Sequence, residues 1–136
     1  MFSSNANDTY SMYKQNSIMT SSPEELTLML YNGLVKFIMQ AQKAIEEKDI
    51  QKANESIKRA EDIISEFQAT LDMQYELSKG LAMLYDYFMD RLVDANMKKD
   101  AAILEEVLHF VKDLRDTWAQ AMKLAKQNSK PLEMAT

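Results

Sequence analysis

Helical periodicity over four long stretches is the feature that most limits how this chain folds. Apolar residues recur at spacings of three and four along about residues 23–47, 50–71, 74–96 and 101–127, which places them on one side of an α-helix. The whole chain contains only two glycines and two prolines, which are few turn-forming residues for a β-sandwich or barrel. The sequence therefore predicts an all-α fold.

Three of the predicted helices begin with residues that favour helix N-termini. Ser22 precedes Pro23 and is followed three positions later by Glu25, which is the pattern of a capping box. Asp49 and Asp100 are the expected N-caps of the second and fourth helices. The connections are short, so neighbouring helices are expected to be antiparallel. The expected architecture is an antiparallel four-helix bundle with an extended N-terminal arm.

Each predicted helix has one apolar stripe that we expect to face the core. In the second helix this stripe covers only roughly 100°, and the opposite face is charged, as one-sided burial requires. The four stripes consist of Leu26, Leu30, Leu34, Phe37, Ala41 and Ala44; Ala53, Ile57, Ala60, Ile64, Phe67 and Leu71; Leu77, Leu81, Leu84, Phe88, Leu92 and Ala95; and Ile103, Val107, Phe110, Leu114, Trp118, Ala121 and Ala125.

The first and third helices carry more apolar surface than one stripe needs. In the first helix the two stripes together cover roughly 220° of the circumference, where a bundle helix needs little more than about 100°. The second stripe of the first helix consists of Leu28, Tyr31, Val35, Ile38 and Met39, and the third helix adds Ala82, Met83, Met89 and Val93. This surplus indicates that something besides the core contacts these two helices.

Length and composition set the domain organisation and the cellular setting. With 136 residues, of which 46% are hydrophobic, the chain is expected to form one domain with its own core. We divide it into an N-terminal arm (1–22), a bundle (23–127) and a flexible tail (128–136). No apolar run approaches about 18 residues, and the N-terminus lacks the pattern of a secretory signal. A cytoplasmic protein without membrane insertion is expected.

Charge and residue usage exclude several further functions. The net charge of −5 disfavours nucleic acid and anionic membranes as partners. The chain has no cysteine, so it has no disulfide and no thiolate site. Its 11 methionines have two interpretations that both stay open, gap-filling in the core or an adaptable binding surface.

No pattern in the sequence points clearly to catalysis. Glu106 and His109 have the Glu-x-x-His spacing of di-iron bundles, but such a site needs two of these motifs and the chain has one histidine. A phosphotransfer module that uses His109 is the alternative hypothesis, although Asp113 and Asp116 would repel a phosphoryl group. Glycine-rich phosphate loops and nucleophile elbows are absent. We expect no enzyme activity, cofactor, metal or small-molecule substrate.

Several ordered motifs extend over about residues 10–122. The first runs through Tyr10, Tyr13, Thr20, Ser22, Pro23, Glu25, Leu26, Met29, Leu30, Tyr31 and Gly33. The second is "LYDYFMDRLVDAN" (84–96), and "ILEEV" and "LRDTW" follow in the fourth helix. In this combination the chain resembles the flagellin-specific export chaperone family, FliS. The loop "LDMQYELSKG" departs from the pattern because it lacks the double glycine of some relatives.

The resemblance implies a cytosolic chaperone that uses neither ATP nor metal. Such a protein binds the disordered C-terminal segment of flagellin, prevents its premature polymerisation and delivers it to the flagellar type III export gate. The arm is expected to cover part of the binding surface when the partner is absent. The residues expected to contact the partner are Tyr10, Tyr13, Ile18, Met19, Leu28, Tyr31, Val35, Ile38, Met39, Met89 and Val93. A homodimer formed through the surplus face is a weaker alternative.

Overall fold

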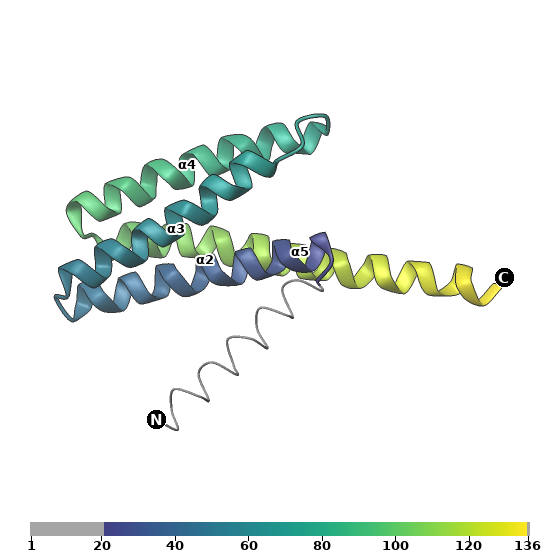
Figure 1. The fold of residues 1–136 in the computed structure, drawn as a ribbon, viewed down its shortest axis with the longest axis horizontal. Helices are drawn as coiled ribbons and strands as arrows, with labels where there is room; N and C mark the ends of the chain where they lie inside the picture. Colours follow the sequence, from purple (N-terminus) through teal and green to yellow (C-terminus); the bar gives the residue numbers. More distant parts are fainter. Residues whose placement is uncertain (1–20, 136) are drawn as a thin grey trace, which may run out of the picture.

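The structure is a computed structural model that describes residues 21–135, with side chains through residue 128. Four helices form it: α2 (Pro23–Glu46), α3 (Ile50–Thr70), α4 (Glu76–Lys98) and α5 (Ala101–Ala135) (Figure 1). Within the described residues there is no strand. The prediction of an all-α helical bundle is confirmed.

The predicted N-caps are found at the starts of three helices. The side-chain oxygens of Ser22 and Asp49 each accept a hydrogen bond from the backbone N–H three residues later, at 3.2 and 3.1 Å. Asp100 accepts one from the N–H of Ala102 at 2.9 Å. These bonds satisfy N–H groups that have no partner inside the helix. The start of α4 is different, because Tyr75 occupies its N-cap position without a side-chain hydrogen bond.

The helices pack in a ring in which α2 contacts α3 and α5, and α4 also contacts α3 and α5. The α2–α3 and α4–α5 turns lie at one end of the bundle, which we call the closed end. Each turn has a lysine in the left-handed region, Lys48 with φ 62° and Lys99 with φ 51°. At the other end, the open end, the pair α3 and α4 diverges from the pair α2 and α5 (Figure 1).

The buried arc of α2 is wider than predicted, because this helix packs against both α3 and α5. Leu34 and Ile38 are fully buried although they come from the two different predicted stripes, and Tyr31 and Val35 are nearly so. The interpretation of Tyr31, Val35 and Ile38 as surplus surface is therefore wrong. Met39, with 49% of its surface exposed, is the member of that stripe that faces solvent.

The buried face of α5 is rotated relative to the predicted stripe. Leu104, Leu108 and Val111 are buried, whereas Phe110 is exposed. The periodicity does not show which neighbour a helix approaches more closely. On α4, Leu77 was assigned to the core stripe but is 75% exposed, because α4 begins at the open end, where the helix pairs have separated.

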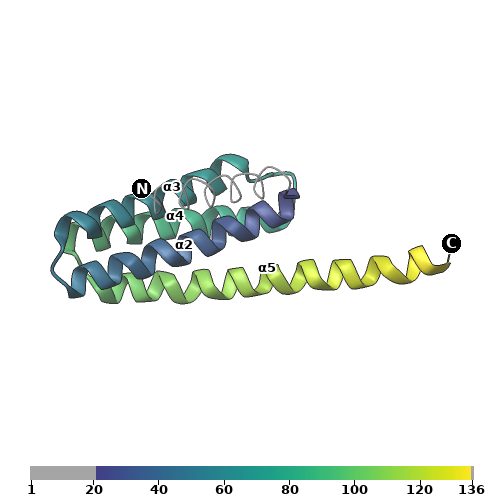
Figure 2. The same cartoon turned by 60° about the horizontal axis from the view of Figure 1, so that its bottom comes forward.

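The last helix extends past its predicted end near Gln127 and reaches Ala135. Pro131 lies inside this segment, and proline removes a backbone N–H and disfavours a helix interior, so local propensity does not explain the extension. Figure 2 shows α5 extending beyond the ends of the other helices. The assignment of residues 128–136 as a flexible tail stays a prediction.

Candidate functional site

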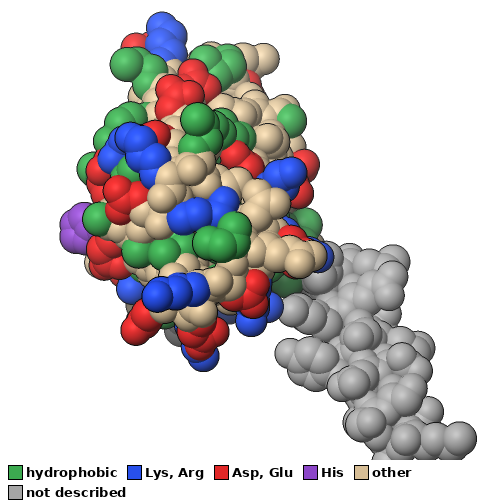
Figure 3. Space-filling view, turned by 90° about the vertical axis from the view of Figure 1, so that its left-hand side faces the viewer, with side chains coloured by type: hydrophobic (Ala, Val, Ile, Leu, Met, Phe, Trp, Pro, Cys, Tyr) green, Lys and Arg blue, Asp and Glu red, His purple; other side chains and the backbone are tan. Residues whose placement is uncertain are grey.

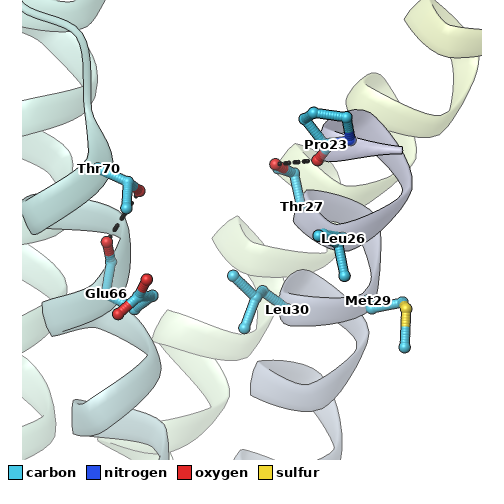
Figure 4. A pocket seen from close by; sticks show the side chains of 7 residues that line it. All are labelled: Pro23, Leu26, Thr27, Met29, Leu30, Glu66 and Thr70. Atoms are coloured by element: carbon cyan, nitrogen blue, oxygen red, sulfur yellow. Dashed lines mark hydrogen bonds between the residues drawn. The ribbon is translucent and has the colours of Figure 1, made fainter. Parts of the chain in front are cut away.

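A groove lies between the first turns of α2 and the last turns of α3, at the open end. Its volume is about 560 Å3. The residues that line it are Pro23, Leu26, Thr27, Met29 and Leu30 from α2, and Glu66 and Thr70 from α3. Figure 4 shows the two helices on either side of an open space, with Leu30 pointing toward α3. We call this feature the α2–α3 groove.

The two threonine hydroxyls of the groove donate their hydrogen bonds within their own helices. The hydroxyl of Thr27 donates to the carbonyl of Pro23 at 3.0 Å, and that of Thr70 donates to the carbonyl of Glu66 at 2.9 Å (Figure 4). A threonine bonded in this way offers mainly its methyl group to the groove. The carboxylate of Glu66 is the one charged group in the lining. The groove is therefore suited to an apolar segment.

An aromatic layer lies next to the groove in the bundle core. The ring centroid of Phe67 is 4.6 Å from that of Tyr31 and 5.3 Å from that of Tyr85. The hydroxyls of the two tyrosines are 2.8 Å apart and share a hydrogen bond. Burial raises the pKa of both Tyr31 and Tyr85, and the shared hydrogen bond raises the pKa of Tyr85 further. The hydrogen bond between these two neutral hydroxyls therefore links α2 to α4.

A second surface lies between α4 and α5, where Met83, Tyr87 and Phe110 are exposed. The hydroxyl of Tyr87 donates to the carboxylate of Glu106, and the guanidinium of Arg91 bonds the same carboxylate at 3.1 Å. These two donors, Tyr87 first, hold the pKa of Glu106 below its usual value. The cluster fixes one turn of α4 against α5.

The lowered pKa of Glu106 predicts how the cluster responds to acid. A carboxylate with a depressed pKa adds stability at neutral pH, and this contribution is lost as the pH falls below the usual value of 4.5. We expect Glu106→Gln to lower the melting temperature at pH 7, and this difference to shrink below pH 4.5. Thermal melts monitored by circular dichroism from pH 7 to pH 3 measure it. An equal effect from Glu55→Gln, at an exposed carboxylate without an ion pair, would contradict the assignment to the cluster.

His109, the residue of the phosphotransfer alternative, lies on the solvent-facing side of α5. Its side chain is 76% exposed, and its Nε2 atom is 3.7 Å from Asp113. Figure 3 shows the histidine at the surface, near charged side chains of both signs. Among the described residues there is no group of three acidic, histidine or cysteine side chains that could hold a metal ion. The carboxylate of Asp113 next to the ring would repel a phosphoryl group.

The predicted partner-binding residues that the structure describes do not form one surface. Tyr10, Tyr13, Ile18 and Met19 lie outside the described residues. Tyr31, Val35 and Ile38 are in the core, Leu28 and Met89 are half-buried, and Met39 and Val93 are exposed. None of the seven that the structure describes lines the α2–α3 groove.

Sequence reasoning missed the groove because its residues have the same spacing as a core stripe. Leu26 and Leu30 were assigned to the core, and both are only half-buried. Glu66 was assigned to a solvated face, and Thr70 and Met29 were given no role as contacts. Their position along the helices could have indicated the groove, because all of them lie within two or three turns of a helix end.

The fold and site together define a class of protein. It is a helical bundle with apolar surface at one end, whose described residues include no metal cluster and no helix with the length and hydropathy needed to cross a membrane. A family model described as "Flagellar protein FliS" matches residues 5–125. The chain belongs to the FliS family of flagellar secretion chaperones.

Curated relatives and a solved structure agree with this assignment. The flagellar secretion chaperone FliS of Bacillus subtilis is 48% identical over 114 residues, which cover 84% of this chain and 86% of the relative. The FliS of Salmonella typhimurium is 31% identical over 109 residues, covering 78% and 81%. A crystal structure of a flagellar chaperone from bacteria superposes with a TM-score of 0.70 at 22% identity, covering 87% of this chain and 98% of that one. This last likeness supports the fold alone.

Family membership decides two of the earlier predictions. FliS proteins are chaperones, so the prediction that the chain is not an enzyme is confirmed. The phosphotransfer hypothesis has no support from the family or from the surroundings of His109. A secretion chaperone of the flagellum implies a flagellar protein as its client.

Proposed function

We propose that this chain binds the disordered C-terminal segment of flagellin in the cytoplasm. By occupying that segment it prevents premature polymerisation, and it delivers the subunit to the flagellar type III export gate. Residues 1–22 act as an arm that covers part of the binding surface when flagellin is absent. No cofactor takes part.

The observation that carries the proposal is the apolar α2–α3 groove at the open end. An amphipathic segment that folds on binding needs a preformed apolar surface to offset the entropy it loses. The groove offers the side chains of Leu26, Met29 and Leu30, and its threonine hydroxyls are already bonded. Uncovered apolar surface of this kind favours aggregation, which gives a covering arm a physical purpose.

A charge placed in the groove tests the proposal. Leu26 is half-buried in the first turn of α2, so Leu26→Glu leaves the core intact and places a second carboxylate in a groove that already holds Glu66. We expect binding to weaken at least tenfold, about 1.4 kcal/mol. Calorimetry with a peptide of the flagellin C-terminal segment measures the affinity.

Lys58→Glu is the matched control, since Lys58 is exposed on α3 and does not line the groove. Its affinity should equal that of the unaltered chain. If the unaltered chain fails to bind the peptide, the proposed function is wrong. If Leu26→Glu binds normally and melts normally, flagellin binds elsewhere on the bundle.

A further inference from the structure

The loop between α3 and α4, together with the first turn of α4, exposes three large apolar side chains within five residues. Met73 is 53% exposed, Tyr75 66% and Leu77 75%. We call these three residues the α3–α4 tip. The tip lies at the open end, and Figures 1 and 2 both place the loop at the end where α2 begins. Thr70, which lines the α2–α3 groove, is the last residue of α3 before this loop.

Hydrogen bonds brace the loop that carries the tip. The buried hydroxyl of Ser78 donates to the carbonyl of Asp72, and the carboxylate of Asp72 accepts from the N–H of Gln74 at 3.0 Å. The N–H of Ser78 donates to the carbonyl of Tyr75 at 3.1 Å. These bonds hold the backbone that carries the apolar side chains in a defined conformation. A preorganised backbone reduces the entropy lost on binding.

Tyr75 also occupies a position where tyrosine has a cost. It is the N-cap of α4 and forms no capping hydrogen bond, whereas Ser22, Asp49 and Asp100 cap the other three helices. A residue that cannot cap leaves N–H groups of the first turn without a side-chain partner. Its side chain makes no ring contact or hydrogen bond with the described residues either. Local rules of this kind are broken mainly at functional sites.

We propose that the α3–α4 tip is a second contact for the flagellin segment that the α2–α3 groove binds, with Tyr75 as its main anchor. This rests on the proposed function. The groove ends at Thr70 and the tip begins three residues later, so a bound segment that continues past the end of α3 meets Tyr75. Aromatic side chains are the residues that most often dominate such contacts. The tip thus lengthens the apolar surface beyond the end of the groove.

Tyr75→Ser separates binding from stability because it moves the two in opposite directions. Serine caps α4, so we expect the melting temperature to rise by about 3 °C. Loss of the aromatic anchor should weaken binding of the flagellin C-terminal peptide about fivefold or more. Met97→Ser is the matched control, since Met97 is 81% exposed on α4 at the closed end, and it should bind like the unaltered chain.

Three results would overturn the inference while leaving the proposed function in place. Unchanged affinity in Tyr75→Ser would show that the tip does not touch the peptide. A lower melting temperature would show that Tyr75 has a structural role. Equal weakening by Met97→Ser would show that any exposed apolar side chain matters. An unaltered chain that does not bind the peptide would instead reject the proposed function itself, and the inference with it.

Discussion

Ile38→Glu is expected to abolish cooperative folding. Ile38 lies on α2 and is fully buried in the core of the bundle. The apolar side chains around it cannot solvate a carboxylate. An unpaired buried charge destabilises a domain by several kcal/mol, about 4 or more, which is a large part of a typical domain's stability. Circular dichroism at 222 nm during heating should show a broad transition or none.

Met39→Glu is the control, because Met39 follows directly in the sequence and is half exposed. It should melt within a few degrees of the unaltered chain, since exposed substitutions usually change stability by about 0.5 kcal/mol or less. A cooperative, unshifted melt for Ile38→Glu would contradict the buried position of this residue. It would also revive the interpretation of the second stripe of α2 as a binding surface.

Removal of one hydroxyl from the buried tyrosine pair is the second large effect. The hydroxyls of Tyr31 and Tyr85 bond each other at 2.8 Å inside the core. Tyr85→Phe leaves the hydroxyl of Tyr31 buried without this partner, which costs about 1–3 kcal/mol. Replacement of both tyrosines removes the unpaired group, so the double variant should be more stable than the sum of the two single changes predicts.

Urea unfolding of the four proteins of this double-mutant cycle measures the coupling. We expect the double variant Tyr31→Phe, Tyr85→Phe to recover at least half of the summed loss. Strict additivity of the two single changes would show that the hydroxyls do not depend on each other. An altered slope of the unfolding curve would point to a change in the denatured state instead.

The positions of the helices followed from local signals in the sequence. Ser22, Asp49 and Asp100 cap helices where predicted, because a capping bond involves only neighbouring residues. The burial of Ile38 and the exposure of Phe110 could not be predicted from such local signals. Each depends on which neighbouring helices a given helix approaches, and periodicity within one helix carries no such information.

The candidate site was the least predictable part of the molecule. Leu26 and Leu30 have the spacing of core residues, and they became groove residues because α2 and α3 diverge at the open end. Tyr75 could have been noticed, since it stands next to a helix start at a position where serine or aspartate is usual. The first family motif contains four of the seven groove residues, Pro23, Leu26, Met29 and Leu30, so it was a second signal for the groove, whereas no motif contains Tyr75.

The closed end has a mechanical consequence for the rest of the bundle. Both of its turns connect one helix pair to the other, whereas the α3–α4 loop joins two helices of the same pair. The pairs are therefore tied by the chain at the closed end only, and nearer the open end the hydrogen bond between Tyr31 and Tyr85 joins them through side chains. Since α2 is about 36 Å long, a rotation of about 3° around the closed end displaces its first turn by about 2 Å. The same rotation would displace Tyr31 by about 1 Å, so a wider groove requires the hydrogen bond between Tyr31 and Tyr85 to lengthen or break.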